Sequence, residues 1–138
     1  MSPVVACDMR FVDDSTWAIL TIYGEARGES FEGKVAVGEV IRNRAQHHYN
    51  CDGTIAGACL APKQFSAWNG NDPNRMLMAR CDSDDAKECI RAWAMVQGGS
   101  EMTKGALLYV NLDVVTPWWV ERCRQTVKIG HHTFFVPV

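Results

Sequence analysis

The stretch TIYGEARGES, residues 21–30, carries two glutamates, Glu25 and Glu29, at the corner between two predicted helices. Before it, apolar residues recur at spacings of three and four after an acidic start, and this pattern predicts an amphipathic helix over residues 15–27. Glu25 falls in the last turn of that helix. Whether the two carboxylates are solvated surface charges or carry chemistry is the first question that the sequence raises.

A second helix is predicted directly after the corner. Gly28 is a plausible terminator of the first helix, and Ser30 can cap the second. Apolar residues then continue at helical spacing up to Arg44, and the sequence HHYN, residues 47–50, suits the end of this helix. The two helices are expected to meet at the corner.

Downstream of the second helix the pattern changes twice. Glycines, prolines and asparagines are frequent over residues 47–74, which predicts an irregular lobe rather than regular helices. Residues 81–99 then give the clearest helical pattern, with acidic residues in the first turn and two glycines at the end. We expect this helix to face the core with apolar residues at helical spacing, namely Ala86, Ile90, Trp93 and Val96.

The C-terminal part of the chain predicts short β structure. GALLYVN, residues 105–111, is a short apolar run, and TPWWVER, residues 116–122, begins with a proline suited to a first helical turn. TVKIGHHTFFV, residues 126–136, has β-branched and aromatic residues around Gly130 and predicts a final hairpin. The predicted fold class is therefore α+β, mainly α, with a minor β lobe or hairpin.

Length and composition predict one compact domain over residues 1–138. The chain has 47% hydrophobic residues, which suffice for a continuous core, and a net charge of -2. Because it contains no run of like charges, we expect no nucleic acid among its partners. No apolar stretch reaches the length of about 18 residues that a membrane span needs, and residues 1–14 lack a secretory signal pattern. These features predict a soluble protein made without a signal peptide.

The six cysteines leave the redox state of the chain open. Their even number is compatible with disulfides, whereas the missing signal peptide argues for a reducing compartment. Cys51 and Cys59 flank a loop that could close a bridge, but Cys81 and Cys89, if both lay on one helix, would be about 12 Å apart, too far for one. Structural zinc favours cysteine or histidine ligands about two to four residues apart, whereas these two cysteine pairs are each eight residues apart. We therefore expect no metal and no cofactor.

Glu25 is the strongest candidate for a group that moves a proton. A carboxyl group acts as a general acid near neutral pH only if an apolar, concave setting keeps it protonated. Glu25 could project from a mostly buried helix into such a cleft, although a glutamate late in an amphipathic helix can equally be a surface residue. Glu29 is a possible second carboxylate. Its other interpretation is an ion pair with Arg27 or Lys34, or a structural hydrogen bond to the corner.

Four blocks of sequence, taken in their order and spacing, are shared with a known family. They are IYGEARGESFEGKVAVGEVIRNR (22–44), QFSAW (64–68), GALLYVN (105–111) with PWW (117–119), and KIGHHTFF (128–135). Together they resemble the cell-wall hydrolase family that includes the spore-cortex-lytic enzymes of the SleB type, over about residues 17–135. The resemblance implies a small lysozyme-like fold that cleaves the glycan strand of peptidoglycan between N-acetylmuramic acid and N-acetylglucosamine.

The resemblance also implies that Glu25 is the catalytic acid. A lytic transglycosylase needs only this one carboxylate, because the sugar's own C6 hydroxyl completes the reaction and leaves a 1,6-anhydro product. A hydrolytic muramidase, in which Glu29 or another carboxylate positions water, is the alternative within the enzyme class. A non-catalytic peptidoglycan-binding protein on the same fold is the alternative outside it.

One block implies a segment that faces the sugar. Gln64, Phe65 and Ser66 are similar to that segment of the family, where an amide and a hydroxyl could bond acetamido or hydroxyl groups. Trp68 lies nearby in sequence as a stacking surface. Packing within the β lobe is the other interpretation of Phe65 and Trp68.

The later blocks imply further residues of the cleft. Tyr109 and Asn111 match family positions that line the cleft beside the acid, where a phenol could hydrogen-bond Glu25 or the substrate. A core position is the other interpretation of Tyr109. His132 matches a histidine near the site, with a structural role equally open. Trp118 and Trp119 are expected to divide between core and groove, because adjacent residues on a helix do not share a face.

The sequence shows neither the secretion signal nor the separate binding module that members of this family often carry. Such a bare domain resembles a bacteriophage endolysin that is made in the host cytoplasm and reaches the wall through a holin-made hole. A piece of a longer secreted enzyme would have the same sequence features. We therefore expect a monomer that acts on the glycan strand of peptidoglycan, its partner, and that serves host lysis.

Overall fold

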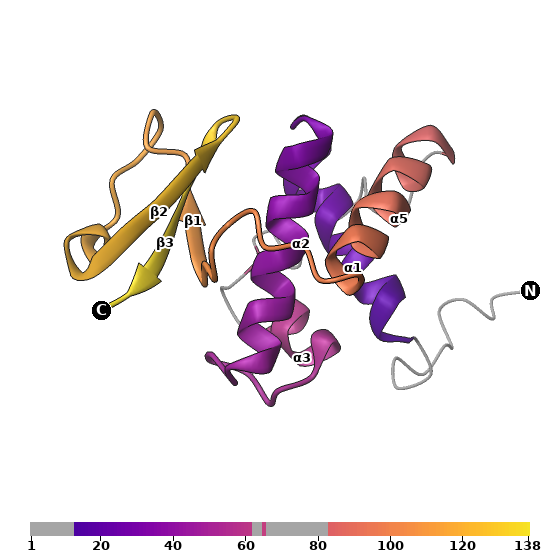
Figure 1. Cartoon of the computed structure of the whole chain (residues 1–138), viewed down its shortest axis with the longest axis horizontal. Coiled ribbons are helices and arrows are strands. Elements are labelled where there is room, and N and C mark those ends of the chain that lie inside the picture. The colour runs from indigo at the N-terminus through magenta and orange to yellow at the C-terminus, as the bar shows by residue number, and fades with distance from the viewer. Residues whose placement is uncertain (1–12, 62–64, 66–82) are drawn as a thin grey trace, which may run out of the picture.

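The computed structural model describes residues 13–61, 65 and 83–138, with the helices gathered beside a small sheet (Figure 1). The helices are α1 (Asp14–Ala26), α2 (Phe31–Gln46), α3 (Ile55–Leu60), α5 (Ser83–Gln97) and the 3-10 helix η3 (Trp118–Arg122). The strands are β1 (Leu108–Val110), β2 (Cys123–Ile129) and β3 (His132–Pro137). The prediction of a mainly helical fold with a minor β element is confirmed. None of the helices in these ranges combines the length and the apolar character that crossing a bilayer requires.

Local capping signals place the first two helices where the sequence predicted them. The side chain of Asp13 accepts a hydrogen bond from the Thr16 amide at 2.9 Å, and the Ser30 hydroxyl accepts one from the Gly33 amide at 3.2 Å. Arg27 caps the end of α1 in ordinary right-handed helical geometry, with φ at -61°. The helix therefore ends directly before Gly28, as predicted, although Gly28 does not adopt the left-handed conformation that often ends a helix.

Helix α2 is the centre of the molecule. Every residue from 33 to 41 is buried, and in Figure 1 the helix runs between the sheet on one side and α1 and α5 on the other. Gly38 permits the close approach of these helices, because a Cβ there would lie 2.9 Å from Cγ2 of Val96 and 3.2 Å from Cδ1 of Ile22. A side chain at Gly38 would push α2 away from α1 and α5.

Helix α5 exists as predicted, but its buried stripe is shifted by one position. The stripe consists of Cys89, Ala92, Trp93 and Val96, whereas Ile90 is 50% exposed. Trp93 and Val96 belong to both the predicted and the observed buried face. The large apolar side chain of Ile90 favoured the predicted face, whereas the observed face includes Cys89 instead. The spacing of three and four that starts at Cys89 is the one that faces α1 and α2.

The segment after α2 is more regular than predicted. Its helix α3 is capped by Thr54, whose hydroxyl accepts a hydrogen bond from the Gly57 amide at 2.8 Å, so the expectation of an irregular lobe is wrong there. Cys51 and Cys59 are separate thiols in this structure, and burial raises the pKa of the Cys59 thiol to about 12. Cys81 lies outside the described residues.

The sheet has the order β1-β3-β2 and is antiparallel throughout. The predicted hairpin is confirmed: β2 and β3 are joined at Gly130, whose φ of +60° suits a glycine. Pairing of β1 with β3 sets Tyr109 opposite Phe134. In η3, Trp118 is 75% exposed, and the half-buried Trp119 packs edge-on against Phe135 with ring centroids 5.4 Å apart. Neither tryptophan is buried in the core, so the predicted division between core and groove is not confirmed.

A buried carboxylate fixes the loop between α5 and β1. Glu39 of α2 is completely buried and accepts four hydrogen bonds of 2.8 Å. The donors are the hydroxyls of Ser100 and Thr103 and the amides of Met102 and Thr103. A buried charge is tolerated only with such a complete set of donors, so this loop is held at a defined place beside α2.

Candidate active site

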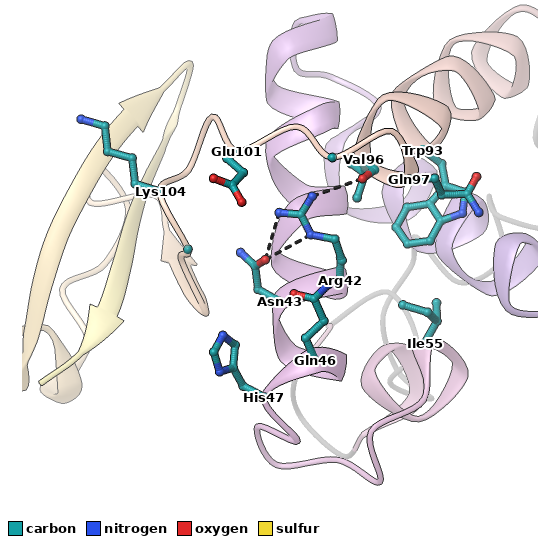
Figure 2. A pocket seen from close by; sticks show the side chains of 12 residues that line it. Arg42, Asn43, Gln46, His47, Ile55, Trp93, Val96, Gln97, Glu101 and Lys104 are labelled. Atoms are coloured by element: carbon teal, nitrogen blue, oxygen red, sulfur yellow. Dashed lines mark hydrogen bonds between the residues drawn. The ribbon is translucent and has the colours of Figure 1, made fainter.

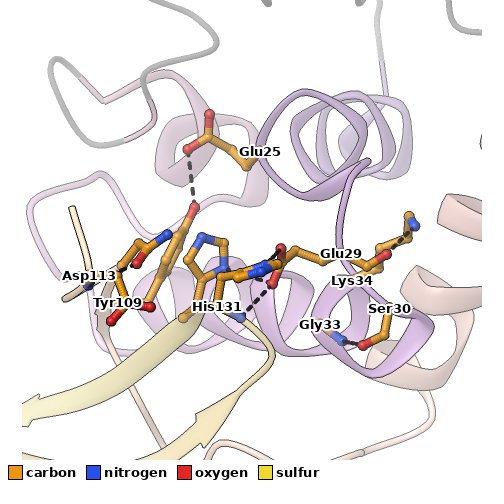
Figure 3. Close-up of polar contacts among 10 residues, drawn as sticks. Glu25, Glu29, Ser30, Gly33, Lys34, Tyr109, Asp113 and His131 are labelled. Carbon is orange, nitrogen blue, oxygen red and sulfur yellow. Dashed lines mark hydrogen bonds and ion pairs between the residues drawn. The ribbon is translucent and has the colours of Figure 1, made fainter.

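Glu25 lies in the last turn of α1 with its side chain half-buried, beside the small sheet. The hydroxyl of Tyr109 on β1 donates a hydrogen bond to its Oε1 at 3.1 Å (Figure 3). The last turn of α1 supplies the carboxylate and the sheet supplies the phenol. The two groups meet only because the sheet packs against this end of the helices.

A hollow of about 300 Å³ opens beside this pair. It brings together four residues that the sequence predicted for the site, which are Glu25, Glu29, Asn111 and His132. The rest of its lining is His131, Gly24, Arg27 and Gly28. The hollow therefore joins the α1–α2 corner to the tip of the β2–β3 hairpin and to the residue that follows β1.

Tyr109 is held by packing as well as by its hydrogen bond. Burial, together with the charge of Glu25, raises the pKa of the phenol well above its ordinary value, so the hydroxyl stays protonated and remains a donor. Its ring centroid lies 4.8 Å from that of His132, 5.6 Å from that of Phe134 and 6.5 Å from that of Phe65. Phe65 is itself 1% exposed and thus packs behind Tyr109.

Glu29 is bonded to the tip of the hairpin. Its side chain is 9% exposed, Oε1 accepts from the His131 amide at 3.0 Å, and Oε2 lies 2.7 Å from Nδ1 of the same histidine (Figure 3). Burial alone would raise the pKa of Glu29, but the hydrogen bonds from His131 and the charges of His131 and His132 outweigh it and lower the pKa. The carboxylate is therefore ionised, and Nδ1 of His131 must be the donor.

Lys34, which the sequence offered as an ion-pair partner of Glu29, does not contact the Glu29 carboxylate. The ammonium group of Lys34 pairs with Glu88 at 2.9 Å and bonds the backbone oxygen of Glu29 at 2.8 Å, rather than its carboxylate. Hydrogen bonding to Glu29 raises the pKa of His131. The two side chains thus stabilise each other's charged forms and tie the corner to the hairpin.

His132 is the first residue of β3 and follows the hairpin tip. Its side chain is 15% exposed, and Nδ1 has no hydrogen-bond partner among the described residues, since Oε1 of Glu29 is 3.9 Å away. Burial lowers the pKa of this imidazole. A neutral ring packed on Tyr109 helps to fix the phenol that reaches Glu25.

Asn111 follows β1 directly and is half-buried. Its Oδ1 accepts a hydrogen bond from the Asp113 amide at 3.0 Å, which fixes the side chain at the rim of the hollow. Gln64, Ser66 and Trp68, the other residues predicted to contact sugar, lie outside the described residues.

Sequence reasoning missed two residues, Arg44 and His131. Arg44 is 4% exposed, its Nε donates to the Leu107 carbonyl at 2.6 Å, and its guanidinium lies 4.7 Å from the centroid of Phe65. Burial lowers the pKa of Arg44, and the charge of Glu25 opposes this shift. The sequence signal that could have identified Arg44 is its position on the same helix face as the apolar residues Val37 and Ile41, where a cation is unexpected. For His131 only its place at a glycine turn gave a hint.

A separate hollow of about 900 Å³ is lined by α2, the start of α3, the end of α5 and the loop that leads to β1 (Figure 2). Its central cation, Arg42, donates to Oδ1 of Asn43 and to the carbonyls of Val96 and Ser100. These bonds join α2 to the end of α5, which is a structural role. Within residues 13–61, 65 and 83–138, no three His, Cys, Asp or Glu side chains gather as a metal ion would require.

Comparisons with known proteins agree on one family. The family model described as Cell Wall Hydrolase matches residues 28–135, so its match begins three residues after Glu25. The spore cortex-lytic enzyme of Oceanobacillus iheyensis is 34% identical over 117 residues, which cover 82% of this chain and 38% of that protein. The enzyme of the same name from Bacillus cereus is 32% identical over 113 residues, covering 82% and 40%. The chain thus spans about two fifths of the length of these relatives.

Two solved structures share the fold. The catalytic domain of the germination-specific lytic transglycosylase SleB from Bacillus anthracis has a TM-score of 0.72 and 27% identity, covering 94% of this chain and 100% of that one. The catalytic domain of the Bacillus cereus SleB protein has a TM-score of 0.73 and 30% identity, covering 89% of each chain. Both alignments extend over most of the helices and the sheet described above.

Proposed function

Because this chain belongs to the cell wall hydrolase family, we propose that it cleaves the glycan strand of peptidoglycan as a lytic transglycosylase. The bond cut is the one between N-acetylmuramic acid and N-acetylglucosamine, and the product carries a 1,6-anhydro ring. The observation that carries the proposal is the half-buried Glu25, bonded by Tyr109, at the edge of a hollow in the fold that the SleB catalytic domains share.

In the first step the protonated Glu25 carboxyl gives its proton to the bridging oxygen as the bond from C1 to that oxygen breaks. Positive charge develops at C1, and the oxygen of the substrate's own N-acetyl group stabilises it. The phenol of Tyr109 holds Oε1, so the orientation of the carboxyl group is fixed while the proton moves.

In the second step the Glu25 carboxylate takes the proton of the C6 hydroxyl. The oxygen of that hydroxyl bonds to C1 and closes the 1,6-anhydro ring, and Glu25 returns to its protonated form. No water is consumed, so one carboxylate performs both proton transfers.

The position of Glu29 supports a mechanism with one carboxylate. Both of its oxygens contact His131, and its side chain is 9% exposed, so it is poorly placed to orient a water molecule for hydrolysis. Glu29 is assigned a positioning role, holding the hairpin tip against the corner. Asn111 at the rim is assigned to a polar group of the sugar, and Gln64, Ser66 and Trp68 keep the sugar-facing role that the family resemblance implies. Phe65 is 1% exposed and is assigned the packing role that was its other interpretation.

A role in phage-induced host lysis stays a prediction. The relatives described above are spore cortex-lytic enzymes, and they lend no support to release through a holin-made hole. Expression inside a Gram-negative host, with and without a co-expressed holin, tests it: lysis that depends on the holin is the expected result.

Digestion of purified peptidoglycan followed by mass spectrometry of the muropeptides tests the reaction. A lytic transglycosylase gives products lighter by one water than those of a hydrolytic muramidase. Glu25→Gln should keep its circular dichroism spectrum and lose activity by about 10²- to 10⁴-fold, the usual contribution of a general acid. Glu29→Gln is the matched control and should keep part of the activity. Wall clearance by Glu25→Gln at the wild-type rate would refute the assignment.

A further inference from the structure

Arg44 is a buried cation of α2 that holds the chain just before β1. It is 4% exposed, and its Nε donates to the Leu107 carbonyl at 2.6 Å. The amide of Leu107 in turn donates to the Phe135 carbonyl of β3 at 3.0 Å. Leu107 is therefore fixed from two sides, by α2 and by the sheet. Tyr109, two residues further along the chain, is thereby held where its phenol reaches Glu25.

The residue before Arg44 makes a parallel contact. The Nδ2 atom of Asn43 donates to the Ala106 carbonyl at 2.9 Å, and Asn43 is as deeply buried as Arg44. Two consecutive side chains of α2 thus bond two consecutive carbonyls at the entry to β1. A neutral amide is sufficient for such a contact, whereas burial of a guanidinium carries a large desolvation cost. The positive charge of Arg44 therefore calls for an explanation besides the backbone bond.

The charge of Arg44 is only partly balanced inside the protein. Its Nη1 atom is buried without a hydrogen-bond partner in the part of the chain that the structure describes, and burial lowers the pKa of the guanidinium. The face of the Phe65 ring, 4.7 Å from the guanidinium carbon to the ring centroid, adds a modest attraction. The negative charge of Glu25 opposes the lowered pKa, so this carboxylate lies within electrostatic range of the cation.

We propose that Arg44 is a positioning residue for the pair formed by Glu25 and Tyr109. Its bond to Leu107 places the phenol, and its positive charge stabilises the carboxylate that Glu25 becomes when the bridging oxygen takes the proton. A fixed buried charge favours a state in which the opposite charge develops nearby. The inference rests on the proposed cleavage of peptidoglycan and adds to it a residue that does not line the hollow beside Glu25.

Other titratable side chains also surround Glu25. They come from the corner, from β1 and from the hairpin, and they are Arg27, Glu29, Tyr109, His131 and His132. Their influence on the pH dependence of cleavage is common to the wild-type enzyme and to variants at position 44. The difference between these proteins therefore reports the charge at position 44.

The test measures kcat and KM across the pH range on soluble muropeptide oligomers. Arg44→Met keeps an unbranched side chain but removes the charge and the bond to Leu107. We expect kcat to fall about tenfold with KM nearly unchanged, as for an interaction made only in the transition state. The basic limb of the kcat profile, where Glu25 loses its proton, should move up by about one pH unit.

Arg44→Lys keeps the charge and loses the planar guanidinium. Its basic limb should stay at the wild-type pH, and kcat should recover to within about fivefold of wild type. A merely structural role would lower activity in both variants without moving the basic limb in either. An unchanged basic limb in Arg44→Met would thus overturn the inference and leave the cleavage itself intact.

Arg42→Met is the matched control. Arg42 also lies on α2 and donates to backbone carbonyls, those of Val96 and Ser100, but it lines the separate hollow beside the end of α5 (Figure 2). Its removal should lower Tm and leave the basic limb at the wild-type pH. Equal shifts of the limb in Arg42→Met and Arg44→Met would mean that the effect is not specific to Arg44, and would overturn the inference.

A double-mutant cycle keeps the inference testable if Arg44→Met does not fold. In a Tyr109→Phe background, Arg44→Lys should hardly lower kcat, because the hydrogen bond that Arg44 supports is already absent. Losses that simply multiply would show that Arg44 does not act through Tyr109, and would overturn the inference. Failure of the wild-type enzyme to cut the glycan strand would refute the proposed function and the inference together.

Discussion

The phenol of Tyr109 donates a hydrogen bond of 3.1 Å to Oε1 of Glu25, although 84 positions separate the two residues in sequence. The phenol remains a hydrogen-bond donor because burial raises its pKa and keeps it protonated. Tyr109 in turn is fixed by the pairing of β1 with β3 and by the ring of His132 on the hairpin. The orientation of the Glu25 carboxyl group therefore depends on the correct placement of the whole sheet.

Tyr109→Phe removes this hydrogen bond and keeps the ring. We expect kcat on peptidoglycan to fall about tenfold to a hundredfold with KM nearly unchanged, because a small misplacement of a catalytic group has effects of that size. Steady-state kinetics with soluble muropeptide oligomers measures the two constants separately. A thermal melt serves as the control for folding, and an unchanged kcat would show that the phenol does not orient Glu25.

The Glu29–His131 pair should make stability depend on pH. The lowered pKa of Glu29 means that its contribution is present above the ordinary value of 4.5 and lost as pH falls through the folded value. The raised pKa of His131 means that its contribution is present below the ordinary value of 6.5 and lost as pH rises through the folded value. The interaction is thus strongest between pH 4.5 and 6.5.

We therefore expect the difference in Tm between wild type and His131→Ala to be largest in that window and to shrink at alkaline and at strongly acidic pH. Thermal denaturation across the pH range measures it. In a Glu29→Gln background the same substitution should give a difference that hardly varies with pH, as a double-mutant cycle requires. A pH-dependent difference in that background would mean that His131 has another charged partner.

Gly130→Ala should disturb the hairpin tip and the site together. The φ of Gly130 is +60°, and an added Cβ would lie 2.7 Å from Oε1 of Glu29. We expect a loss of about 3 kcal/mol in the free energy of unfolding, from backbone strain and from the displaced hydrogen bond of a charged group. Urea denaturation measures it, and activity should fall as well.

Gly105→Ala is the matched control for that variant. Its φ of +83° is equally unfavourable for alanine, but an added Cβ meets nothing within 4 Å. This variant should lose only about 1–2 kcal/mol, the cost of the strain. Equal losses in the two variants would show that the contact with Glu29 contributes nothing.

Glu39→Gln should destabilise the fold away from the site. The carboxylate accepts four hydrogen bonds, and an amide would set its own N–H group against two of those donors. We expect a loss of about 3 kcal/mol in the free energy of unfolding, measured with urea. Glu101→Gln, an exposed change in the same loop, should be nearly neutral. Near-equal effects would mean that the buried hydrogen bonds do not hold this loop.

Local signals in the sequence were sufficient for the elements of regular structure. Asp13 and Ser30 cap helices at the predicted positions, and Gly130 turns the predicted hairpin. Capping and tight turns involve residues only a few positions apart, so the information lies within the segment itself. The same reasoning failed where two patterns competed, as for the buried face of α5, or where a short helix was hidden among breakers, as for α3.

The sequence by itself therefore determined the two helices around the corner, the final hairpin and, through family resemblance, the choice of Glu25 and Tyr109. The tertiary structure decided what these groups contact: the phenol of Tyr109 bonds Glu25, and His131 bonds Glu29 across 102 positions. The physical reason is that side-chain pairs between distant segments depend on how the helices and the sheet pack, and no local pattern encodes the direction in which a charged side chain finds its partner.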